Sequence, residues 1–483
     1  MYPLNLSTAK PSTHTPTVIR QKGKLVARFN TILAGISLVL ASSTSFAASP
    51  AVEKIDSEKL AAQVKAETRH AWQGYKKYAW GQDALKPLSK SGHNWYQHSL
   101  LMTPVDALDT LIIMGLDKEA AEARELIATK LNFDQDMYVQ NFEITIRLLG
   151  GLLSGYQLTQ DQRLLDLAHD LGKRLLPVFD SPTGLPYTHV NLRTGKVKGT
   201  VSNPAETGTL IMEFGLLSEL TGNPVFMEKS KQALVATWQR RSKLGLVGAA
   251  INVETGEWVN TTAHIGGAVD SYYEYLYKCY RMFGDNDCKK MWQDSIQGVN
   301  QYLAEEVNGD LWYGHAEMHS GKRLSSQYGA LDAFMPALLA LGGDLPRAQR
   351  LQDANLKMWR LHGIEPESID YRTMQVKSPE YALRPEIVES AYYLYHYTKD
   401  EKYRRMGAEF WRDFVKHCRT PAGFAALKDV RTKQHEDSME SFLFAETFKY
   451  YYLLFAKPEK LNFERITFNT EAHPLRSQRQ VQP

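Results

Sequence analysis

Carboxylates recur at the starts of a set of apolar segments in this sequence. They are Asp106 and Asp109, Glu143, Glu206, Asp270, Glu386 with Glu389, and Glu440 with Glu446. One acid at a helix start is commonly a cap or a dipole partner, worth about 0.3 to 1 kcal/mol. Carboxylates that converge in a cleft instead repel one another and need a cation, a proton or a hydroxyl-rich ligand. We expect these acids to face one rim, and their repetition favours a functional site there.

The same residue types suit the hydrolysis of a glycosidic bond. The leaving oxygen needs a protonated carboxylic acid, and an ionised carboxylate must either activate water or attack the anomeric carbon. Aromatic residues near these acids offer faces for sugar rings, although ordinary core packing explains them equally well. They are Trp95, Tyr96, Tyr272, Tyr273 and Phe442. Periodicity alone does not identify the sugar.

The apolar segments end in a repeated way, at a glycine or a polar turn. Seven endings occur, 44 to 62 residues apart, and the last lies just before Ala456. The first six are at residues 114–117, 158–161, 220–223, 283–285, 341–344 and 397–400. Between them we predict amphipathic helices over 227–241, 288–306, 347–362 and 401–418. Each repeat is therefore expected to be a helical hairpin.

The helices that precede the endings are apolar on nearly all sides, which indicates burial on most faces. Examples are residues 142–158, 211–220, 391–397 and 440–455. Alternating patterns typical of strands are short and few, as in 248–259. We predict an all-α fold, an (α/α)7 barrel of helical hairpins with the buried helices as its inner ring and short β-hairpins at one end. An open solenoid is the alternative, but it would need a polar final helix.

The first 47 residues have the pattern of a secretory signal peptide. They contain five basic residues and no acid, and the apolar run 32–41 precedes the small residues Ser45 and Ala47. That run is too short to cross a bilayer of roughly 30 Å as a helix. We expect cleavage after Ala47 and export to the periplasm or the medium, with an uncleaved membrane anchor as the alternative. Residues 48–483 are then one catalytic barrel, with its core at about 65–475.

Composition argues against several kinds of partner. Loss of residues 1–47 changes the formal net charge from +3 to −2, so neither nucleic acid nor an anionic membrane is favoured. The 43% apolar fraction is ample for a buried core and excludes disorder. We expect a monomer. Cys279 and Cys288 flank a turn at Gly284, and either a disulfide or a pair of free buried thiols fits them.

Seven segments, in order along the chain, resemble glycoside hydrolase family 47, the class I α-1,2-mannosidases. They are residues 70–80, 105–111, 142–151, 270–275, 384–390, 440–447 and 468–474. Residues 331–336, 423–433 and 436–440 further resemble the ER degradation-enhancing α-mannosidase-like (EDEM) branch, here in a bacterial form. The resemblance implies the (α/α)7 barrel and calcium-dependent, exo-acting, inverting hydrolysis of terminal α-1,2-linked mannose. High-mannose N-glycans, glycoproteins that carry them, or mannan are the implied substrates.

The resemblance also implies roles for individual residues. Glu143 corresponds to the general acid, Glu386 to the general base and Asp270 to a third essential carboxylate. The implied substrate-binding residues are Arg147, Arg384, Glu389, Phe442 and Glu446. Thr470 is the implied calcium ligand through its hydroxyl and carbonyl oxygens, with waters held by Glu389, Glu446 and Glu471 completing the coordination. The sequence has no EF-hand loop, so calcium follows from the resemblance alone.

Two alanines depart from the ER processing enzyme of the family. Ala268 stands where that enzyme has an arginine that restricts which branch is trimmed, and Ala330 stands where it has a histidine. Both changes imply a roomier pocket and leave the branch preference open. The competing function is an EDEM-like, lectin-like protein that binds mannose with little or no hydrolysis. A glycosidase of the same fold that acts on another sugar is a third option.

Overall fold

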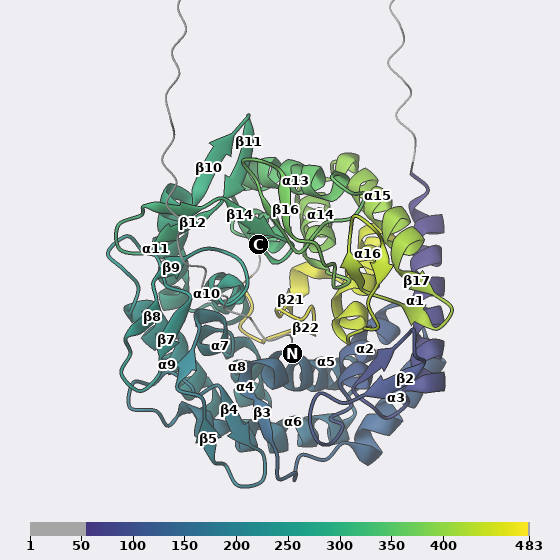
Figure 1. Ribbon diagram of the computed structural model, residues 1–483. Helices are drawn as coiled ribbons and strands as arrows, with labels where there is room; N and C mark the ends of the chain where they lie inside the picture. Colours follow the sequence, from purple (N-terminus) through teal and green to yellow (C-terminus); the bar gives the residue numbers. More distant parts are fainter. Residues whose placement is uncertain (1–54, 482–483) are drawn as a thin grey trace, which may run out of the picture. The chain divides into compact units, whose positions relative to one another are not determined.

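Seven helical hairpins close into a ring over residues 55–481, the part of the chain that the computed structural model describes (Figure 1). The expected signal peptide and its cleavage point lie outside these residues. Within them, no helix is both long and apolar enough to cross a membrane.

The inner ring is made of helices that are buried on most sides. It comprises α2 (Met102–Ile113), α5 (Gly150–Thr159), α8 (Ile211–Thr221), α10 (Asp270–Phe283), α12 (Met335–Leu341), α14 (Glu386–Thr398) and α16 (Phe448–Phe455). Short helices α4 (Asn141–Ile144) and α7 (Pro204–Gly208) precede α5 and α8. Every residue of α12 and α16 is buried. The residues of α12 are all apolar, and the one charged residue of α16, Lys449, is paired with Asp109.

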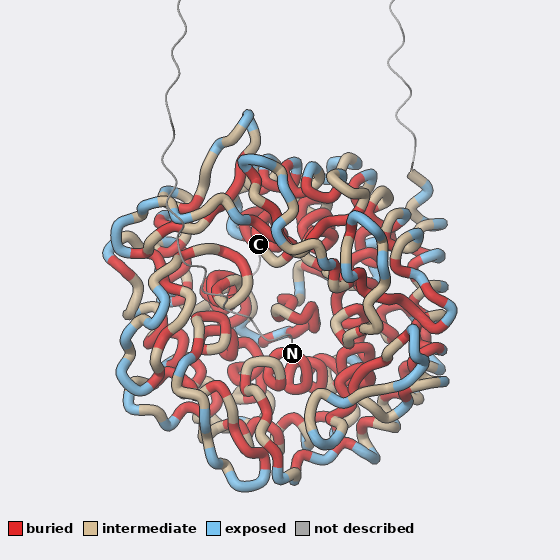
Figure 2. The backbone as a smooth tube through the Cα atoms, viewed as in Figure 1, coloured by how far each residue is buried: buried red, intermediate tan, exposed pale blue. Residues whose placement is uncertain are grey.

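The outer ring is amphipathic. It comprises α1 (Ser57–Tyr78), α3 (Asp117–Lys130), α6 (Gln162–Leu175), α9 (Val225–Gln239), α11 (Asn286–Tyr302), α13 (Leu345–Arg360) and α15 (Glu401–Cys418). Each inner helix packs against the outer helix that follows it, and α16 packs against α1, which closes the ring. Figure 2 shows the buried residues on the inside and the exposed ones at the periphery. The predicted barrel is confirmed, and the open solenoid is excluded.

Three predicted helices differ in detail from the structure. The helix expected over 288–306 ends at Tyr302, because Ala304–Val307 (β10) pairs with Asp310–Tyr313 (β11) across a turn in which Asn308 and Gly309 have φ of 53° and 86°. The helices expected over 142–158 and 440–455 contain π-helical turns at Thr145–Leu149 and Leu443–Thr447. Both π-turns carry residues of the predicted site.

Short strands, except β21 and β22 after α16, connect each outer helix to the next inner helix, so they lie at the end of the ring where the inner helices begin. Three-stranded sheets are β3–β4–β5 (Tyr138–Gln140, His189–Asn191, Val197–Lys198), β6–β7–β8 (Val201–Ser202, Ala250–Asn252, Trp258–Asn260), β9–β12–β13 (Thr262–Ala263, His315–Glu317, Arg323–Ser325) and β14–β15–β16 (Gln327–Gly329, Ser368–Asp370, Gln375–Ser378). Two-stranded sheets are β1–β2 (Ala84–Lys86, Ser91–His93), β10–β11, β17–β18 (Arg419–Thr420, Gly423–Phe424), β19–β20 (Leu427–Asp429, Gln434–His435) and β21–β22 (Thr467–Phe468, Pro474–Leu475). The β21–β22 hairpin lies inside the ring (Figure 1).

A disulfide joins two adjacent helices of the barrel. Cys279 in α10 is bonded to Cys288 in the first turn of α11, which settles the choice between a disulfide and free thiols. Cys418 at the end of α15 is buried and free.

Candidate active site

The three predicted catalytic acids lie at the same end of the inner ring. Asp270 and Glu386 are the first residues of α10 and α14, and Glu143 lies in the short helix α4 that leads into α5. At the first turn of a helix the dipole favours the ionised carboxylate. The fold therefore places acids from three separate hairpins at the same end of the ring.

Glu143 is held by an arginine one turn later. Arg147 Nε donates to Glu143 Oε2 at 2.9 Å, and Arg147 Nη1 forms an ion pair with Glu471. The guanidinium lies 5.1 Å from the ring centre of Trp95 and 5.9 Å from that of Phe442. Arg147 is itself on the π-turn, a feature that is frequent at functional sites.

Glu386 has a second arginine beside it. Arg384 donates to both carboxylate oxygens of Glu367, at 2.6 and 3.2 Å, and its guanidinium lies 6.0 Å from the ring centre of Phe442. The guanidiniums of Arg147 and Arg384 thus lie 5.9 and 6.0 Å from the centre of the half-buried Phe442 ring, so the two arginines share one aromatic neighbour. Glu386 Oε2 is buried and has no hydrogen-bond partner among the described residues.

Burial raises the pKa of two of these acids. The pKa of Glu386 rises to about 7 although the nearby charge of Arg384 lowers it, and the pKa of Asp270 also rises to about 7, with Glu274 adding to the effect of burial. A carboxyl with a pKa near the working pH exchanges protons readily, which is the property required of a general acid or base.

Thr470 lies at the tip of the β21–β22 hairpin, directly against the inner ring. Its N–H donates to the Tyr275 hydroxyl at 3.3 Å. Asn469 fixes the tip, because its side-chain amide donates to Ile146 O at 2.9 Å and to Glu213 Oε1 at 2.8 Å. Among the described residues, neither the hydroxyl nor the carbonyl oxygen of Thr470 takes part in a hydrogen bond, so both are free to bind a ligand.

The surroundings of Thr470 fit a hard cation. Glu389, Glu446 and Glu471 are each less than a tenth exposed, and burial together with the neighbouring carboxylates raises the pKa of Glu446 well above its usual range. Crowded carboxylates of this kind are stabilised by a cation. Within residues 55–481, the only trio of acidic, His or Cys side chains close enough to bind one ion directly is Cys279, Asp285 and Cys288, which includes the disulfide. The three glutamates therefore do not converge as direct ligands of one ion.

Two of the acids expected on the rim are buried in the core. Asp106 and Asp109 are fully buried in α2, where His473 and Lys449 pair with them. The prediction that they face an opening is wrong, because His473 of the β21–β22 hairpin and Lys449 of α16 pair with them inside the core. Asp106 also lies 3.6 Å from Arg147 Nη1, so it supports that arginine.

The remaining rim acids have polar partners of their own. Glu206 accepts from Gln140 at 2.6 Å and from Ser202 at 3.0 Å, and Glu440 accepts from the Trp95 indole at 2.9 Å.

Three acids beside the site lie outside the predicted set. Glu367 pairs with Arg384, Glu365 is fully buried with both oxygens unpartnered among the described residues, and Asp332 packs against Gly266 with Oδ1 unpartnered. Glu365 and Glu367 lie in a loop, where helical periodicity gives no signal. The sequence Glu365-Pro-Glu367, two acids around a proline ahead of the Arg384 segment, was the available clue.

The two alanines differ in accessibility. Ala330 is fully buried. Ala268 is half-buried and has φ of 80°, a left-handed conformation that is rare for residues other than glycine.

Comparisons with known proteins agree with these features. A model of glycosyl hydrolase family 47 matches residues 67–477. The α-mannosidase I MNS4 of Arabidopsis thaliana is 39% identical over 419 residues, 84% of this chain and 66% of that protein. The ER degradation-enhancing α-mannosidase-like protein 3 of Homo sapiens is 35% identical over 496 residues, 95% of this chain and 52% of that protein.

A solved structure shares the whole architecture. The α-1,2-mannosidase from Trichoderma reesei has a TM-score of 0.80 at 27% identity, covering 87% of this chain and 99% of its own. The chain thus spans about two thirds and about half of the length of the two curated relatives above, but nearly all of the solved enzyme. The similarity to family 47 and to its EDEM-like branch, predicted from the sequence, is confirmed.

Proposed function

Because this chain belongs to glycosyl hydrolase family 47, we propose that it is an exo-acting, inverting α-1,2-mannosidase that depends on calcium. Its proposed substrates are the terminal α-mannose residues of high-mannose N-glycans, free or on glycoproteins, or of mannan. The observation that carries the proposal is the common aromatic floor, because Phe442 lies between the arginines that accompany Glu143 and Glu386.

In the proposed reaction, protonated Glu143 donates its proton to the glycosidic oxygen as the bond from that oxygen to the anomeric carbon breaks. Ionised Glu386 takes a proton from a water molecule, whose oxygen forms the new bond to the anomeric carbon from the opposite face. The product mannose is therefore released as the β-anomer. Asp270, which is raised in pKa by burial, lies beside the scissile bond and holds the sugar or the water.

Two arginines have positioning roles in this proposal. The 2.9 Å bond from Arg147 fixes the orientation of the Glu143 carboxyl, and the positive charge of Arg384 favours the ionised form of Glu386. Phe442 provides the floor under the mannose ring. Substrate hydroxyls are the proposed partners of Glu389 and Glu446, which face the cation site.

For calcium, the hydroxyl and carbonyl oxygens of Thr470 are the proposed direct ligands, and Glu389, Glu446 and Glu471 are proposed to hold its waters. A bound calcium ion supplies positive charge that keeps these carboxylates ionised and offers coordination positions to sugar hydroxyls. The oxygens of Thr470 that make no hydrogen bond support this assignment.

Export to the periplasm or the medium is also part of the proposal. The buried Cys279–Cys288 disulfide supports it, since disulfides persist in oxidising compartments. We further propose that the protein acts as a monomer and binds neither nucleic acid nor, after loss of residues 1–47, a membrane.

Release of free mannose from a high-mannose oligosaccharide, with and without a calcium chelator, tests the function. Release that the chelator abolishes and added calcium restores is the expected result. Glycan binding without release would establish the lectin-like alternative, and release that the chelator leaves unchanged would remove calcium from the proposal.

A further inference from the structure

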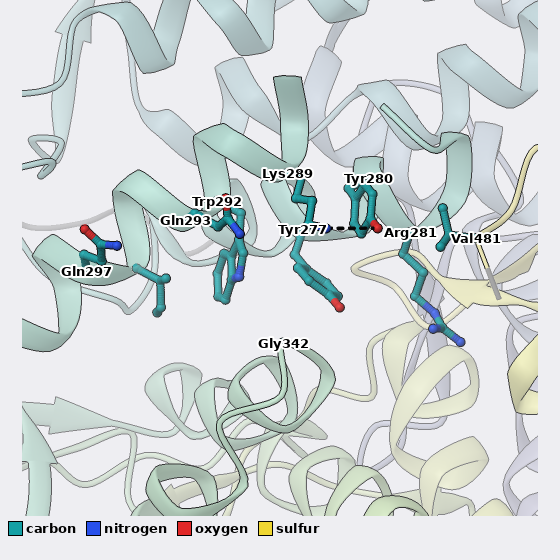
Figure 3. A pocket seen from close by; sticks show the side chains of 10 residues that line it. Tyr277, Tyr280, Arg281, Lys289, Trp292, Gln293, Gln297, Gly342 and Val481 are labelled. Carbon is teal, nitrogen blue, oxygen red and sulfur yellow. Dashed lines mark hydrogen bonds between the residues drawn. The ribbon is translucent and has the colours of Figure 1, made fainter. Parts of the chain in front are cut away.

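A hollow of about 440 Å³ lies between the far end of α10, helix α11 and the end of α12 (Figure 3). Its volume is within the roughly 300 to 1,000 Å³ typical of small-molecule sites. Arg281, which lines it, is eleven residues after Asp270 in the same helix. At the helical rise per residue these positions are about 16 Å apart along the axis. The hollow is therefore distinct from the catalytic opening.

The lining of this hollow contains two cations, Arg281 and Lys289, and no acidic residue. The Arg281 side chain is only 7% exposed, yet its Nη2 has no hydrogen-bond partner among the described residues. Glu464 Oε2, which also has no hydrogen-bond partner among the described residues, lies 3.8 Å from Arg281 Nη2, within ion-pair range but beyond hydrogen-bond distance. The other oxygen of Glu464 is bonded to His396. A buried guanidinium with an unsatisfied N–H is costly, so an anionic ligand would stabilise it.

The rest of the lining suits a polar ring. Tyr277 and Trp292 form an edge-to-face pair with ring centres 5.5 Å apart, and both point across the hollow toward Gly342 in Figure 3. The exposed amides of Gln293 and Gln297 each provide donors and an acceptor, which matches the hydroxyl groups of a sugar. Aromatic faces beside a few placed polar groups are the usual composition of a ligand site.

The walls of the hollow are joined covalently. The Cys279–Cys288 disulfide connects α10 to α11, and Cys288 immediately precedes Lys289. A rigid, preformed site loses less entropy when it binds a ligand.

We propose that this hollow is an accessory binding site for a small sugar that carries an anionic group, either a carboxylate or a phosphate. The anion pairs with Arg281 and Lys289, the hydroxyl groups bond to Gln293 and Gln297, and the apolar face of the ring packs against Tyr277. This site is independent of the proposed hydrolysis, because it shares no residue with the catalytic opening.

Calorimetry on the full chain with four probes tests the proposal. Glucuronate carries a carboxylate and mannose 6-phosphate carries a phosphate, so they represent the two anion types. Mannose provides the sugar ring without the anion, and inorganic phosphate provides the anion without the ring. At least one of the two acidic sugars is expected to bind at least about tenfold more tightly than mannose or inorganic phosphate. Which of the two binds identifies the anion. Equal binding of inorganic phosphate would mean an adventitious ion only, and no binding of either acidic sugar would overturn the proposal.

Three variants locate the binding. Arg281→Gln and Lys289→Gln are each expected to weaken the acidic sugar about tenfold. Lys290→Gln is the matched control, because Lys290 is the next residue of α11, pairs with Asp294 at 3.0 Å and does not line the hollow.

Mannose release is expected to stay unchanged in all three variants, which shows that they fold. If Arg281→Gln does not fold, Lys289→Gln still decides the outcome. Equal weakening by Lys290→Gln would mean non-specific charge attraction and would contradict the site.

Discussion

Two acids of the inner ring, the buried Asp109 and the half-buried Glu386, have opposite electrostatic environments. Asp109 in α2 is fully buried, but its two oxygens are bound by Lys449 at 2.8 Å, His473 at 2.7 Å and Ser154 at 2.9 Å. Glu386 at the start of α14 has a buried oxygen with no partner among the described residues. Asp109 and Glu386 were both expected to face the functional rim, because each is an acid near the beginning of an apolar helix.

The pKa values follow the partners. Burial raises the pKa of Asp109, but Lys449 and His473 outweigh it and bring the value to about 2. Burial is also the main effect at Glu386, where Arg384 only partly offsets it and the pKa rises to about 7. Satisfied hydrogen bonds, and not burial alone, thus separate an acid that stabilises the fold from one that is available for chemistry.

The largest expected effect is on catalysis. Glu386→Gln removes the proposed base and is expected to lower kcat for mannose release by about 10² to 10⁴-fold. The free energy of unfolding is expected to stay the same or rise, because a buried ionisable group is lost. Glu401→Gln is the matched control, since Glu401 is likewise the first residue of a helix but is exposed on the outer ring. Turnover retained by Glu386→Gln would end its role as the base.

The opposite outcome is expected at Asp109. Asp109→Asn leaves Lys449 without its carboxylate partner in the core and leaves His473 with Asp106 alone. Breaking a buried pair in this way costs about 3 to 5 kcal/mol of unfolding free energy. Urea unfolding measures the loss, and mannose release per folded molecule should persist. Asp161→Asn, which affects an exposed pair with Arg163, should cost less than about 1 kcal/mol. Equal losses of unfolding free energy in Asp109→Asn and Asp161→Asn would contradict the stabilising role of the Asp109 pairs.

The shifted pKa values of these buried residues also imply that the stability of the protein depends on pH. The pKa of His473 is raised to about 9, against burial, by Asp109 and Asp106. Its stabilising effect is therefore complete below about pH 6.5 and is lost as the pH rises to about 9, up to about 3 kcal/mol.

The other groups change stability at lower pH. Asp109, with its lowered pKa, contributes above about pH 4 and loses that contribution as the pH falls to about 2. Asp270 and Glu386, with raised values, progressively reduce stability as the pH rises from about 4 to about 7, and the reduction persists at higher pH. Urea unfolding at pH 6.5 and 9 measures the loss from His473 together with the last part of this reduction, and a stability that rises over this interval would contradict both.

Calcium provides the smallest expected effect. At one hundred times its dissociation constant, the ion should stabilise the wild-type chain by about 2.7 kcal/mol. Thr470→Ala should weaken calcium binding and reduce this gain, whereas Thr373→Ala in the exposed β15–β16 turn should not. Unchanged calcium affinity of Thr470→Ala by calorimetry would remove Thr470 as the ligand.

Much of the fold was predictable because it depends on local sequence. The seven helix endings and the residues of α15 agree with the periodicity, since apolar spacing and turn residues determine both. The π-turns were not predictable, because one extra residue in a turn hardly changes a periodic pattern.

The difference in pKa between Asp109 and Glu386 was not predictable from their places at the starts of apolar helices. The low pKa of Asp109 depends on Lys449 and His473, which lie more than 300 residues from it in the sequence. Glu365 and Glu367 were missed because they lie in a loop. The roles proposed for Glu143, Asp270 and Glu386 came from the family resemblance, whereas their positions at the same end of the inner ring follow from the closed barrel.

The anomeric configuration of the first product tests the proposed acid and base most directly. Proton NMR of mannose released by the wild-type enzyme, recorded before mutarotation, is expected to show the β-anomer, because Glu386 directs water to the face opposite the leaving oxygen. Initial α-mannose would contradict an inverting reaction between Glu143 and Glu386.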